Sequence, residues 1–526
     1  MFDLIIRNGS LYDGTGAPPL NADLGIRGEK IDAIGDLSSA GAHRIIDAAG
    51  QAVAPGFIDT HTHSEGDLLV NPQHANGLRQ GITTEIMGLD GMSFAPLSAA
   101  NHSLYRRWLC GLLGDEVEGL DMSSIAAFRS HYHKKVAINT AYLVPQGAIR
   151  LEILGFRDAP LQGEDMARAK RRLLEGLEEG AVGFSTGASY YPDPWACTDE
   201  LIELCQSVRA AGKVYVNEPR KALLERAFGG DGVAEGLEIA RRAGVPVHFA
   251  HYRTSAENAG QVEALMAPFE RARAAGVDCS MDVYPYPTGS SISVANLPAY
   301  AQEGGPAAIL QRLADPDQRA RISHDLDHVH YDTLEDVVFT SLPRHRHLEG
   351  MSLSAVAHAR DRSPGAALCE LLLEEELAVG YLRAPAISTA LWRQVSRDVL
   401  ELLARPEYMA CSDITPCGSM PHPRCYGAFP RFLGRLRRQF GGPSLELMVQ
   451  RMTDNPAQRF GIRGRGRIEK GYFADLVVFD PERIIDTATY DDPRQFPQGI
   501  PFVLVNGQVA VDDERCTGVL AGQAVP

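Results

Sequence analysis

The sequence lacks the features that mark secreted and membrane-embedded proteins. Residues 1–9 have no basic n-region and no long apolar run, so they do not read as a signal peptide, and no apolar stretch approaches transmembrane length. Nine cysteines are scattered without any Cys-x-x-Cys pair, which gives no sign of a disulfide framework. We therefore predict reduced thiols and a cytoplasmic location.

An excess of positive charge is also missing. The formal net charge is −16, which argues against nucleic acid and anionic membranes as partners and leaves a small-molecule substrate as the expected one. The hydrophobic fraction of 44% and the charged fraction of 22% are those of an ordinary globular protein. A length of 526 residues exceeds the usual size of one domain. The composition leaves a homo-oligomer open.

Both ends of the chain have the texture of a small β module. Short β-type runs broken by turn residues occupy the first 55 residues, and the same pattern returns near the C-terminus. We therefore predict one module built from residues 1–55 and 455–526. Its expected strands are 3–7, 22–27, 30–34, 44–47, 474–480 and 502–507.

The middle of the chain repeats a β-then-α rhythm. The strand-like segments are 57–60, 83–87, 137–143, 182–185, 214–217, 247–250, 278–282 and 409–412. Alternating strands and helices predict a parallel sheet, and eight strands fit a (β/α)8 barrel over residues 56–454, with active-site residues at the strand C-terminal ends. A doubly wound open sheet is the alternative, but no Gly-x-Gly-x-x-Gly follows the first strand. The rhythm breaks around 291–348, which indicates an insertion or lid near the barrel mouth.

Two histidines close the first strand-like segment of this middle region. The apolar run ends in Asp59-Thr60-His61-Thr62-His63, and a spacing of two puts both imidazoles on one side of a strand. Neutral imidazole is the commonest protein ligand for a transition metal. The competing interpretation is a strand end whose histidines face solvent. The preceding β-rich stretch and a later Ser-Asp pair favour a metal site.

Two further strand ends carry compatible chemistry. His251 follows 247–250, and strand alternation would place it on the face of Phe249, opposite His248, so we expect it to point inward as a metal ligand. A satisfied core histidine is the alternative. Asp413 also ends a strand, and a carboxylate beside a divalent cation can accept a proton from water and return it to a leaving group. The alternative for Asp413 is a helix N-cap.

Glu218 and Asp90 offer oxygen donors near other strand ends. Glu218 closes the segment 214–217, and Asp90 lies in the glycine-rich turn 88–91. Either carboxylate could ligate a metal, although an aspartate in a turn usually makes only local bonds.

Two tyrosines and two arginines are candidates for binding substrate. Tyr190 and Tyr284 each follow a strand and could place a phenol over a substrate, and Arg253 and Arg424 could grip a carboxylate through bidentate hydrogen bonds. Without further context, such residues are more often packed at a rim or solvated.

In these residues and in the motifs around them, the chain resembles the amidohydrolase superfamily, and within it the N-acyl-D-amino-acid deacylase (D-aminoacylase) family. The likeness runs nearly end to end. The His-Pro-Arg block that begins at His422 is fairly specific for the family, whereas the His-x-His pair and the tail mark only the superfamily. The matching segments are 55–63, 80–84, 183–187, 282–286, 422–431, 452–457 and 471–479.

The resemblance implies a (β/α)8 barrel, a terminal β-sandwich made from both ends of the chain, and metal-dependent hydrolysis of an N-acyl bond. Zinc is the implied cofactor, with Mn²⁺ or Co²⁺ as alternatives. His61 and His63 would hold one metal position, His251 would hold the tighter one, and Asp413 would be the general base and acid. The positions that orient the substrate carboxylate and carbonyl are matched by Tyr190, Arg253, Tyr284 and Arg424.

The chain departs from the family pattern at three positions. Asp90 stands where the family usually has cysteine, Glu218 where it usually has histidine, and Gln146 where histidine is also usual. Two of the three ligands expected for the tighter zinc are thus carboxylates, which are harder donors and should shift the site toward harder ions such as Mn²⁺ or leave a more labile zinc. Since carboxylates can still coordinate, we interpret this as a rebuilt metal site.

These observations favour a metal-dependent amidohydrolase that cleaves the acyl C–N bond of an N-acyl amino acid, with the D configuration implied by the resemblance. Metal-activated water would attack the carbonyl, and Asp413 would shuttle the proton. An alternative is a repurposed enzyme of the same fold that carries out another amide-forming or cyclisation step in a biosynthetic pathway. A binding protein without catalysis is a third hypothesis.

Overall fold

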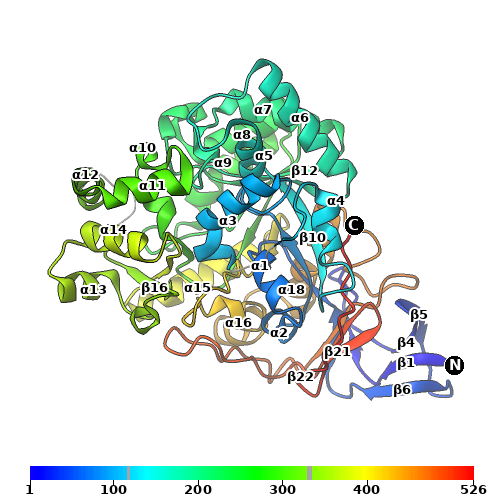
Figure 1. The fold of residues 1–526 in the computed structure, drawn as a ribbon. Helices are drawn as coiled ribbons and strands as arrows, with labels where there is room; N and C mark the ends of the chain where they lie inside the picture. The colour runs from blue at the N-terminus through cyan, green and yellow to red at the C-terminus, as the bar shows by residue number, and fades with distance from the viewer. Residues whose placement is uncertain (115–118, 329–333) are drawn as a thin grey trace.

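Eight parallel strands form a barrel at the centre of the molecule (Figure 1). The computed structural model describes residues 1–114, 119–328 and 334–526. Each barrel strand pairs in parallel with its neighbour, as the repeating β-then-α rhythm predicts. In spatial order the strands are β8 (Phe57–Asp59), β9 (Ile82–Met87), β10 (Asn139–Pro145), β11 (Gly183–Gly187), β12 (Val214–Glu218), β13 (Val247–Phe249), β14 (Cys279–Val283) and β18 (Tyr408–Ala410).

The first and last barrel strands meet just beyond their C-terminal ends. A parallel bridge joins Thr62 to Ile414. The amide of His63 donates to the carbonyl of Ile414 at 3.0 Å, and the amide of Asp413 donates to the carbonyl of His61 at 2.9 Å. These bonds close the barrel and confirm the predicted (β/α)8 fold. They also bring the His-x-His pair beside Asp413.

Helices surround the barrel on its outer side (Figure 1). Helix α8 shows why they pack there: the Asp231 side chain caps its N-terminus by accepting from the amide of Ala234, and Ile239 and Ala240 on its inner face are buried. The helices between barrel strands include α3 (Ala99–Leu113), α5 (Gln146–Leu154), α6 (Gly163–Glu178), α7 (Thr198–Ala210), α8 (Gly232–Ala243), α9 (Val262–Ala274) and α15 (Thr389–Ala404).

A long segment separates β14 from β18. It contains a three-stranded antiparallel sheet in the order β15-β17-β16, made of β15 (Ser290–Ile292), β16 (Val337–Ser341) and β17 (Gly380–Arg383). Its helices are α10 (Ala299–Gln302), α11 (Gly305–Ala314), α12 (Pro316–His328), α13 (Leu353–Arg360) and α14 (Pro364–Glu374). Residues 329–333, inside the predicted insertion, lie outside the described residues.

The two ends of the chain meet in two β-sheets beside the barrel (Figure 1). One sheet holds β1 (Phe2–Arg7), β4 (Asp23–Arg27), β5 (Lys30–Gly35) and β6 (Ala42–Asp47). The other holds β2 (Ser10–Leu11), β3 (Leu20–Asn21), β7 (Ala52–Pro55), β19 (Leu476–Phe479), β20 (Phe502–Val505), β21 (Gln508–Asp512) and β22 (Arg515–Cys516). A shared core joins N-terminal residues such as Leu4 and Ile26 to C-terminal residues such as Leu476 and Leu504. We propose Gly56, between β7 and β8, as the boundary with the barrel.

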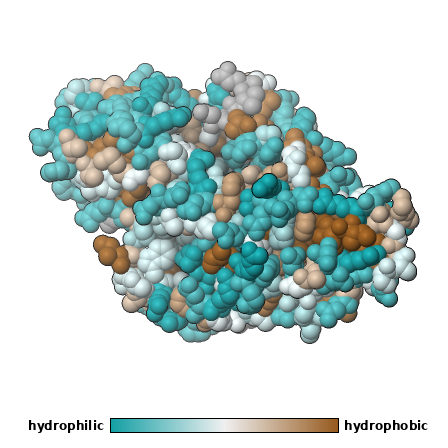
Figure 2. All heavy atoms as spheres, turned by 90° about the horizontal axis from the view of Figure 1, so that it is seen from below, coloured by the Kyte–Doolittle hydropathy of each residue, from teal (hydrophilic) through white to brown (hydrophobic). Residues whose placement is uncertain are grey.

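The face of the molecule shown in Figure 2 is mostly hydrophilic. On the face shown in Figure 2, hydrophobic residues form separate patches among polar ones. In the part of the chain that the structure describes, no helix combines the length and the apolar character needed to cross a bilayer.

Candidate metal and catalytic site

The loops that follow the barrel strands turn sharply at three of the predicted site residues. Asp90, His251 and Asp413 have positive φ angles of 54°, 34° and 54°. Few residues other than glycine adopt this left-handed conformation, and such positions cluster at functional sites. Each turn directs a side chain toward the barrel axis, where the three side chains lie near one another and near His61.

Asp90 and three imidazoles form the centre of the site. The Oδ2 atom of Asp90 lies 3.2 Å from Nε2 of His61 and 3.3 Å from Nε2 of His63. It lies 3.9 Å from Nε2 of His251. The two Nε2 atoms of the His-x-His pair are 3.3 Å apart. These four donor atoms, which come from the ends of β8 and β13 and from the turn after β9, therefore face a common point.

Asp413 approaches the same point from β18. Its Oδ1 lies 3.7 Å from Nε2 of His61 and 3.6 Å from Nε2 of His63. Its other oxygen, Oδ2, lies 2.6 Å from Nη1 of Arg424, whose Nη2 donates to Ser290 Oγ at 3.1 Å. Arg424 is completely buried, so this ion pair holds Asp413 in place with one oxygen left facing the histidines. The arginine that we predicted to bind substrate therefore contacts the predicted general base.

Glu218 joins the site through His251. The Oε1 atom of Glu218 lies 4.0 Å from Nε2 of His251, at the end of β12. The carboxylate is 3% exposed, whereas the His251 side chain is 19% exposed. Glu218 thus sits deeper than the imidazole that it approaches.

The reason that we gave for the inward position of His251 is wrong. Strand β13 ends at Phe249, whose ring packs edge-on against Phe269 of α9, outside the barrel. His248 is the strand residue that points into the barrel, where its Nε2 lies 3.0 Å from Asp282 Oδ2. His251 reaches the site because the chain leaves the strand and turns, which ends the two-residue alternation.

Asp282 lies in the segment 282–286 that matches the family, and no role was predicted for it. Its side chain fixes the turn at His251. Its Oδ1 accepts from the backbone amide of His251 at 2.5 Å, and its Oδ2 accepts from the Thr60 hydroxyl at 2.7 Å. The side chain is fully buried in β14. Asp282 is a charged residue inside β14, the strand that pairs with β13, and this position is the sequence signal that could have identified it.

Replacing Asp282 with asparagine is expected to weaken divalent-cation binding by about 10- to 100-fold, as is typical for residues that orient ligands. An asparagine nitrogen in place of Oδ1 could not accept from the His251 amide, and one in place of Oδ2 could not accept from the Thr60 hydroxyl, so a bond that holds the turn would be lost either way. Metal titration of the purified protein measures the effect, with Ser280→Ala, which removes the hydroxyl bonded to Nδ1 of His248, as a matched control. Unchanged affinity in the Asp282 variant would contradict the positioning role.

Burial and charge together shift the titration of these groups in the metal-free protein. Burial lowers the pKa of His61, but Asp90 and Asp413 overcome it and raise that pKa to about 10. Burial would raise the pKa of Asp90, yet the neighbouring His61 holds it well below its ordinary value. Burial, with the charge of Asp90, raises the pKa of Glu218 well above its ordinary value, and burial lowers the pKa of His251 to about 4. Such opposed shifts within one cluster of side chains are typical of functional sites.

The donor set fits a divalent metal cation. The candidate ligands form two groups, and within each group all ligand atoms lie within 4.8 Å of one another. One group is His61, Asp90 and His251, and the other is His61, His63 and Asp413. Asp90 Oδ1 and Glu218 Oε2 are buried without a hydrogen-bond partner, so oxygens remain available to an ion. Imidazole nitrogens and carboxylate oxygens are the donors that zinc and manganese bind in proteins.

The predicted substrate-binding residues lie beside the cluster of candidate metal ligands. Arg253 Nη2 donates to the Tyr284 hydroxyl at 2.7 Å, and the guanidinium groups of Arg253 and Arg424 lie 4.3 and 4.7 Å from the centroid of the Tyr284 ring. The Tyr190 hydroxyl lies 2.9 Å from Ser291 Oγ of β15. Burial raises the pKa of Tyr190 well above its ordinary value, so its phenol stays protonated.

Two other residues bear on the shape of the site. Gln146, one of the three departures from the family pattern, is buried and donates to Glu200 Oε1 of α7 at 3.3 Å. Asp59, which we had not assigned a role, accepts from the amides of Ser412 at 2.9 Å and His61 at 3.2 Å. It therefore ties the end of β8 to the end of β18, beneath the metal ligands.

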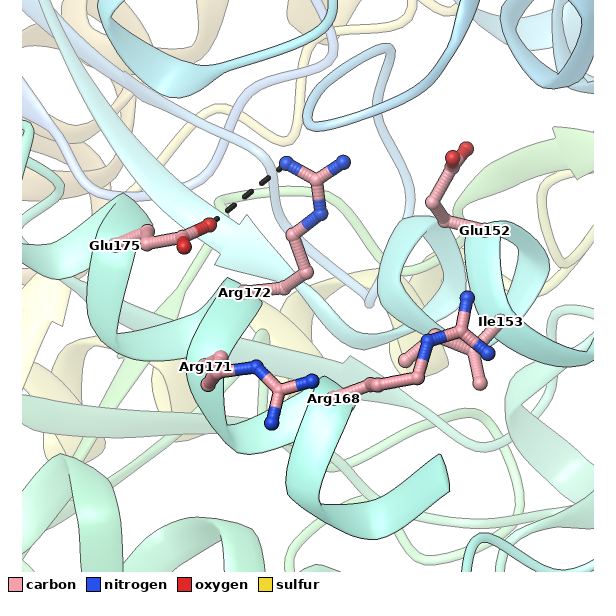
Figure 3. Close-up of a pocket in the computed structure, with 6 residues that line it drawn as sticks. All are labelled: Glu152, Ile153, Arg168, Arg171, Arg172 and Glu175. Atoms are coloured by element: carbon pink, nitrogen blue, oxygen red, sulfur yellow. Dashed lines mark ion pairs between the residues drawn. The ribbon is translucent and has the colours of Figure 1, made fainter. Parts of the chain in front are cut away.

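A hollow on the outside of the barrel is not part of this site. Figure 3 shows it between α5 and α6. Its volume is about 230 Å³. Its lining residues are Glu152, Ile153, Arg168, Arg171, Arg172 and Glu175. The arginines pair with acidic residues of α6, as between Arg172 and Glu175 at 3.7 Å. None of the predicted site residues lines the hollow.

The fold and the site together define the class: a (β/α)8 enzyme with a cluster of candidate metal ligands at the strand C-terminal ends, where the active sites of such barrels lie. Residues 227–511 match the model of the amidohydrolase family. D-aminoacylase of Alcaligenes xylosoxydans xylosoxydans is 33% identical over 530 residues, which cover 100% of this chain and 97% of that protein.

Solved structures show the same relationship. N-acyl-D-glutamate deacylase from Bordetella bronchiseptica, complexed with zinc and a phosphonate inhibitor that mimics the tetrahedral intermediate, superposes with a TM-score of 0.83 at 30% identity, covering 100% of this chain and 99% of that one. A D-aminoacylase structure, described for its binuclear metal centre, gives a TM-score of 0.81 at 31% identity with both chains covered completely. The chain therefore belongs to the D-aminoacylase family of the amidohydrolase superfamily, hydrolases that act on carbon–nitrogen bonds other than peptide bonds.

Proposed function

We propose that the protein hydrolyses the acyl C–N bond of an N-acyl-D-amino acid, giving a carboxylic acid and the free amino acid. The observation that supports this most directly is the convergence of His61, His63, Asp90 and His251 with Asp413 at one point. Together with Glu218, the first four would hold a divalent cation, Zn²⁺ by analogy with the relative that was solved with zinc. Such an ion supplies polarisation of the acyl carbonyl and acidification of water.

The protein's own groups perform the proton transfers. Asp413 accepts a proton from the attacking water through Oδ1, the oxygen that Arg424 leaves free, and returns it to the leaving amine. The protonated phenol of Tyr190 donates a hydrogen bond to the carbonyl oxygen as negative charge develops there. Arg253 and Tyr284, already bonded to each other, bind the substrate carboxylate and orient the acyl group.

A substrate panel tests the proposal. The purified protein, supplied in turn with Zn²⁺, Mn²⁺ and Co²⁺, is assayed against N-acyl-D-amino acids, their L enantiomers and cyclic amides. We expect turnover of the D series. Absence of turnover with every metal would reject the proposal, and turnover of cyclic amides alone would favour the alternative of a different amide chemistry.

Replacing Arg253 with methionine is expected to raise KM about 10- to 100-fold for an N-acyl amino acid while changing kcat less, because a charged hydrogen bond contributes about 1.5–3 kcal/mol. KM for the corresponding C-terminal amide, which lacks the carboxylate, should not change. Steady-state kinetics on the acid and the amide measure both effects. Arg405→Met is the control, since Arg405 pairs with Glu263 and Glu270 outside the barrel. An equal rise in KM for acid and amide would contradict the carboxylate contact.

A further inference from the structure

The candidate metal site is rich in oxygen donors. Three imidazoles and three carboxylates surround it: His61, His63, His251, Asp90, Glu218 and Asp413. Within the described part of the chain, the groups of potential ligands at this site contain histidine and aspartate but no cysteine. The buried thiol of Cys411, two residues before Asp413, does not belong to either group. A cation here would bind nitrogen and oxygen only.

Asp90 and Glu218 each present one buried oxygen that could bind a cation. Asp90 Oδ2 lies within 4 Å of all three imidazole Nε2 atoms, and Asp90 Oδ1 is buried without a partner. Glu218 Oε2 is also buried without a partner. Burying carboxylate oxygens without partners costs free energy. A cation that binds these oxygens would remove that cost, which favours its binding.

The charge balance points the same way. Among the described residues, Arg424 is the guanidinium within ion-pair distance of these carboxylates, and it pairs with Asp413. With His61 neutral as a metal ligand and both carboxylates ionised, Asp90 and Glu218 would present two negative charges that one divalent cation neutralises. Hard, weakly polarisable cations gain most from charged oxygen donors, whereas zinc gains most from thiolate and imidazole.

Resting on the metal-dependent function proposed above, we propose that Asp90 and Glu218 set the cation preference of this centre. They do so by lowering the ratio Kd(Mn)/Kd(Zn), the factor by which Zn²⁺ binds more tightly than Mn²⁺. Zinc binds most nitrogen and oxygen sites more tightly than manganese does, so the signature is the ratio of the two dissociation constants and not their order. The many oxygen donors also suit manganese, which accepts more ligands than the four that zinc usually takes.

The test measures cation binding without substrate. The metal-free full-length protein is titrated with Mn²⁺ and with Zn²⁺ in chelator-buffered solutions, and bound metal is counted by mass spectrometry while Mn²⁺ is followed by electron paramagnetic resonance. We expect the ratio Kd(Mn)/Kd(Zn) to be at least tenfold larger in the double variant Asp90→Cys, Glu218→His than in the natural protein. Glu203→His, which places an imidazole on the exposed side of α7, should leave the ratio unchanged.

A second variant protects the test against misfolding of the first. Glu218→Gln keeps the shape of the side chain but removes its charge, and we expect it to weaken Mn²⁺ binding at least tenfold and Zn²⁺ binding less. Equal ratios in all variants, or a Glu218→Gln variant that binds Mn²⁺ normally, would overturn the inference. If the natural protein hydrolyses its substrate while the ratio stays unchanged, only the cation preference fails. If it retains no divalent ion, the proposed function fails as well.

Discussion

Replacing Asp413 with asparagine is expected to lower kcat by about 10³- to 10⁴-fold, at the upper end of what one acid–base residue contributes, because the same carboxylate both accepts and returns the proton. Asparagine keeps the shape of the side chain and an oxygen for Arg424, whose Nη1 lies 2.6 Å from the carboxylate, but it cannot take up a proton. Steady-state assays with the best substrate of the panel measure the loss. KM should change little, since Asp413 acts on water and the leaving amine.

Metal analysis separates this catalytic effect from loss of the cation. His61, His63 and Asp90 are unaltered, so the variant should retain close to the natural amount of bound metal. Asp512→Asn, at a surface ion pair with Arg44 in the β module, is the matched control and should keep full activity. An Asp413→Asn enzyme within tenfold of natural activity would show that another group carries the proton.

The fold was predictable because its signal is local. Alternating apolar segments identified all eight barrel strands; β12, for example, was expected at 214–217 and spans Val214–Glu218. The closure of the barrel was not visible in the same way. It depends on the bridge between Thr62 and Ile414, which lie past the apolar runs and are more than 350 residues apart in sequence. Pairing over that distance follows from the curvature of the whole sheet.

The site was predictable in part, because parallel strands bring their C-terminal ends together. That rule alone places His61, Glu218 and Asp413 on one side of the barrel. It does not fix the direction of a side chain in a loop, and so the alternation argument for His251 failed once the chain turned at a φ of 34°. Asp282 was missed because its partner is a backbone amide, which leaves no pair of side chains to recognise; its place in β14, next to β13, was its sequence signal.

Removing the bound cation is expected to lower kcat about 10³-fold or more, since an ion that polarises the carbonyl contributes several kcal/mol to the transition state. The protein should also unfold more readily, because a ligand present at about 1,000 times its Kd adds roughly 4 kcal/mol to the free energy of unfolding. Dialysis against a chelator, followed by activity assays and calorimetry before and after metal is restored, measures both. A chelated protein that keeps its activity and its melting temperature would contradict a metal-dependent site.

The pH dependence of metal rebinding follows from His61. The pKa of its imidazole is raised from 6.5 to about 10 in the metal-free protein, so the ring is protonated at pH 8 and must lose that proton to become a ligand. Rebinding below that pKa should therefore release the proton of His61, and the raised pKa of Glu218 adds to the release. Metal affinity should rise about tenfold or more per pH unit up to near pH 10, where His61 is no longer protonated. The folding stability of the metal-free protein changes with pH in the opposite direction. The stability contributed by protonated His61 is full below pH 6.5 and is lost as the pH rises through 10. The benefit of bound metal to stability should thus grow with pH, and calorimetric titrations in buffers of different ionisation enthalpy count the proton. Binding at pH 8 without proton release would show that another ligand, and not His61, receives the cation.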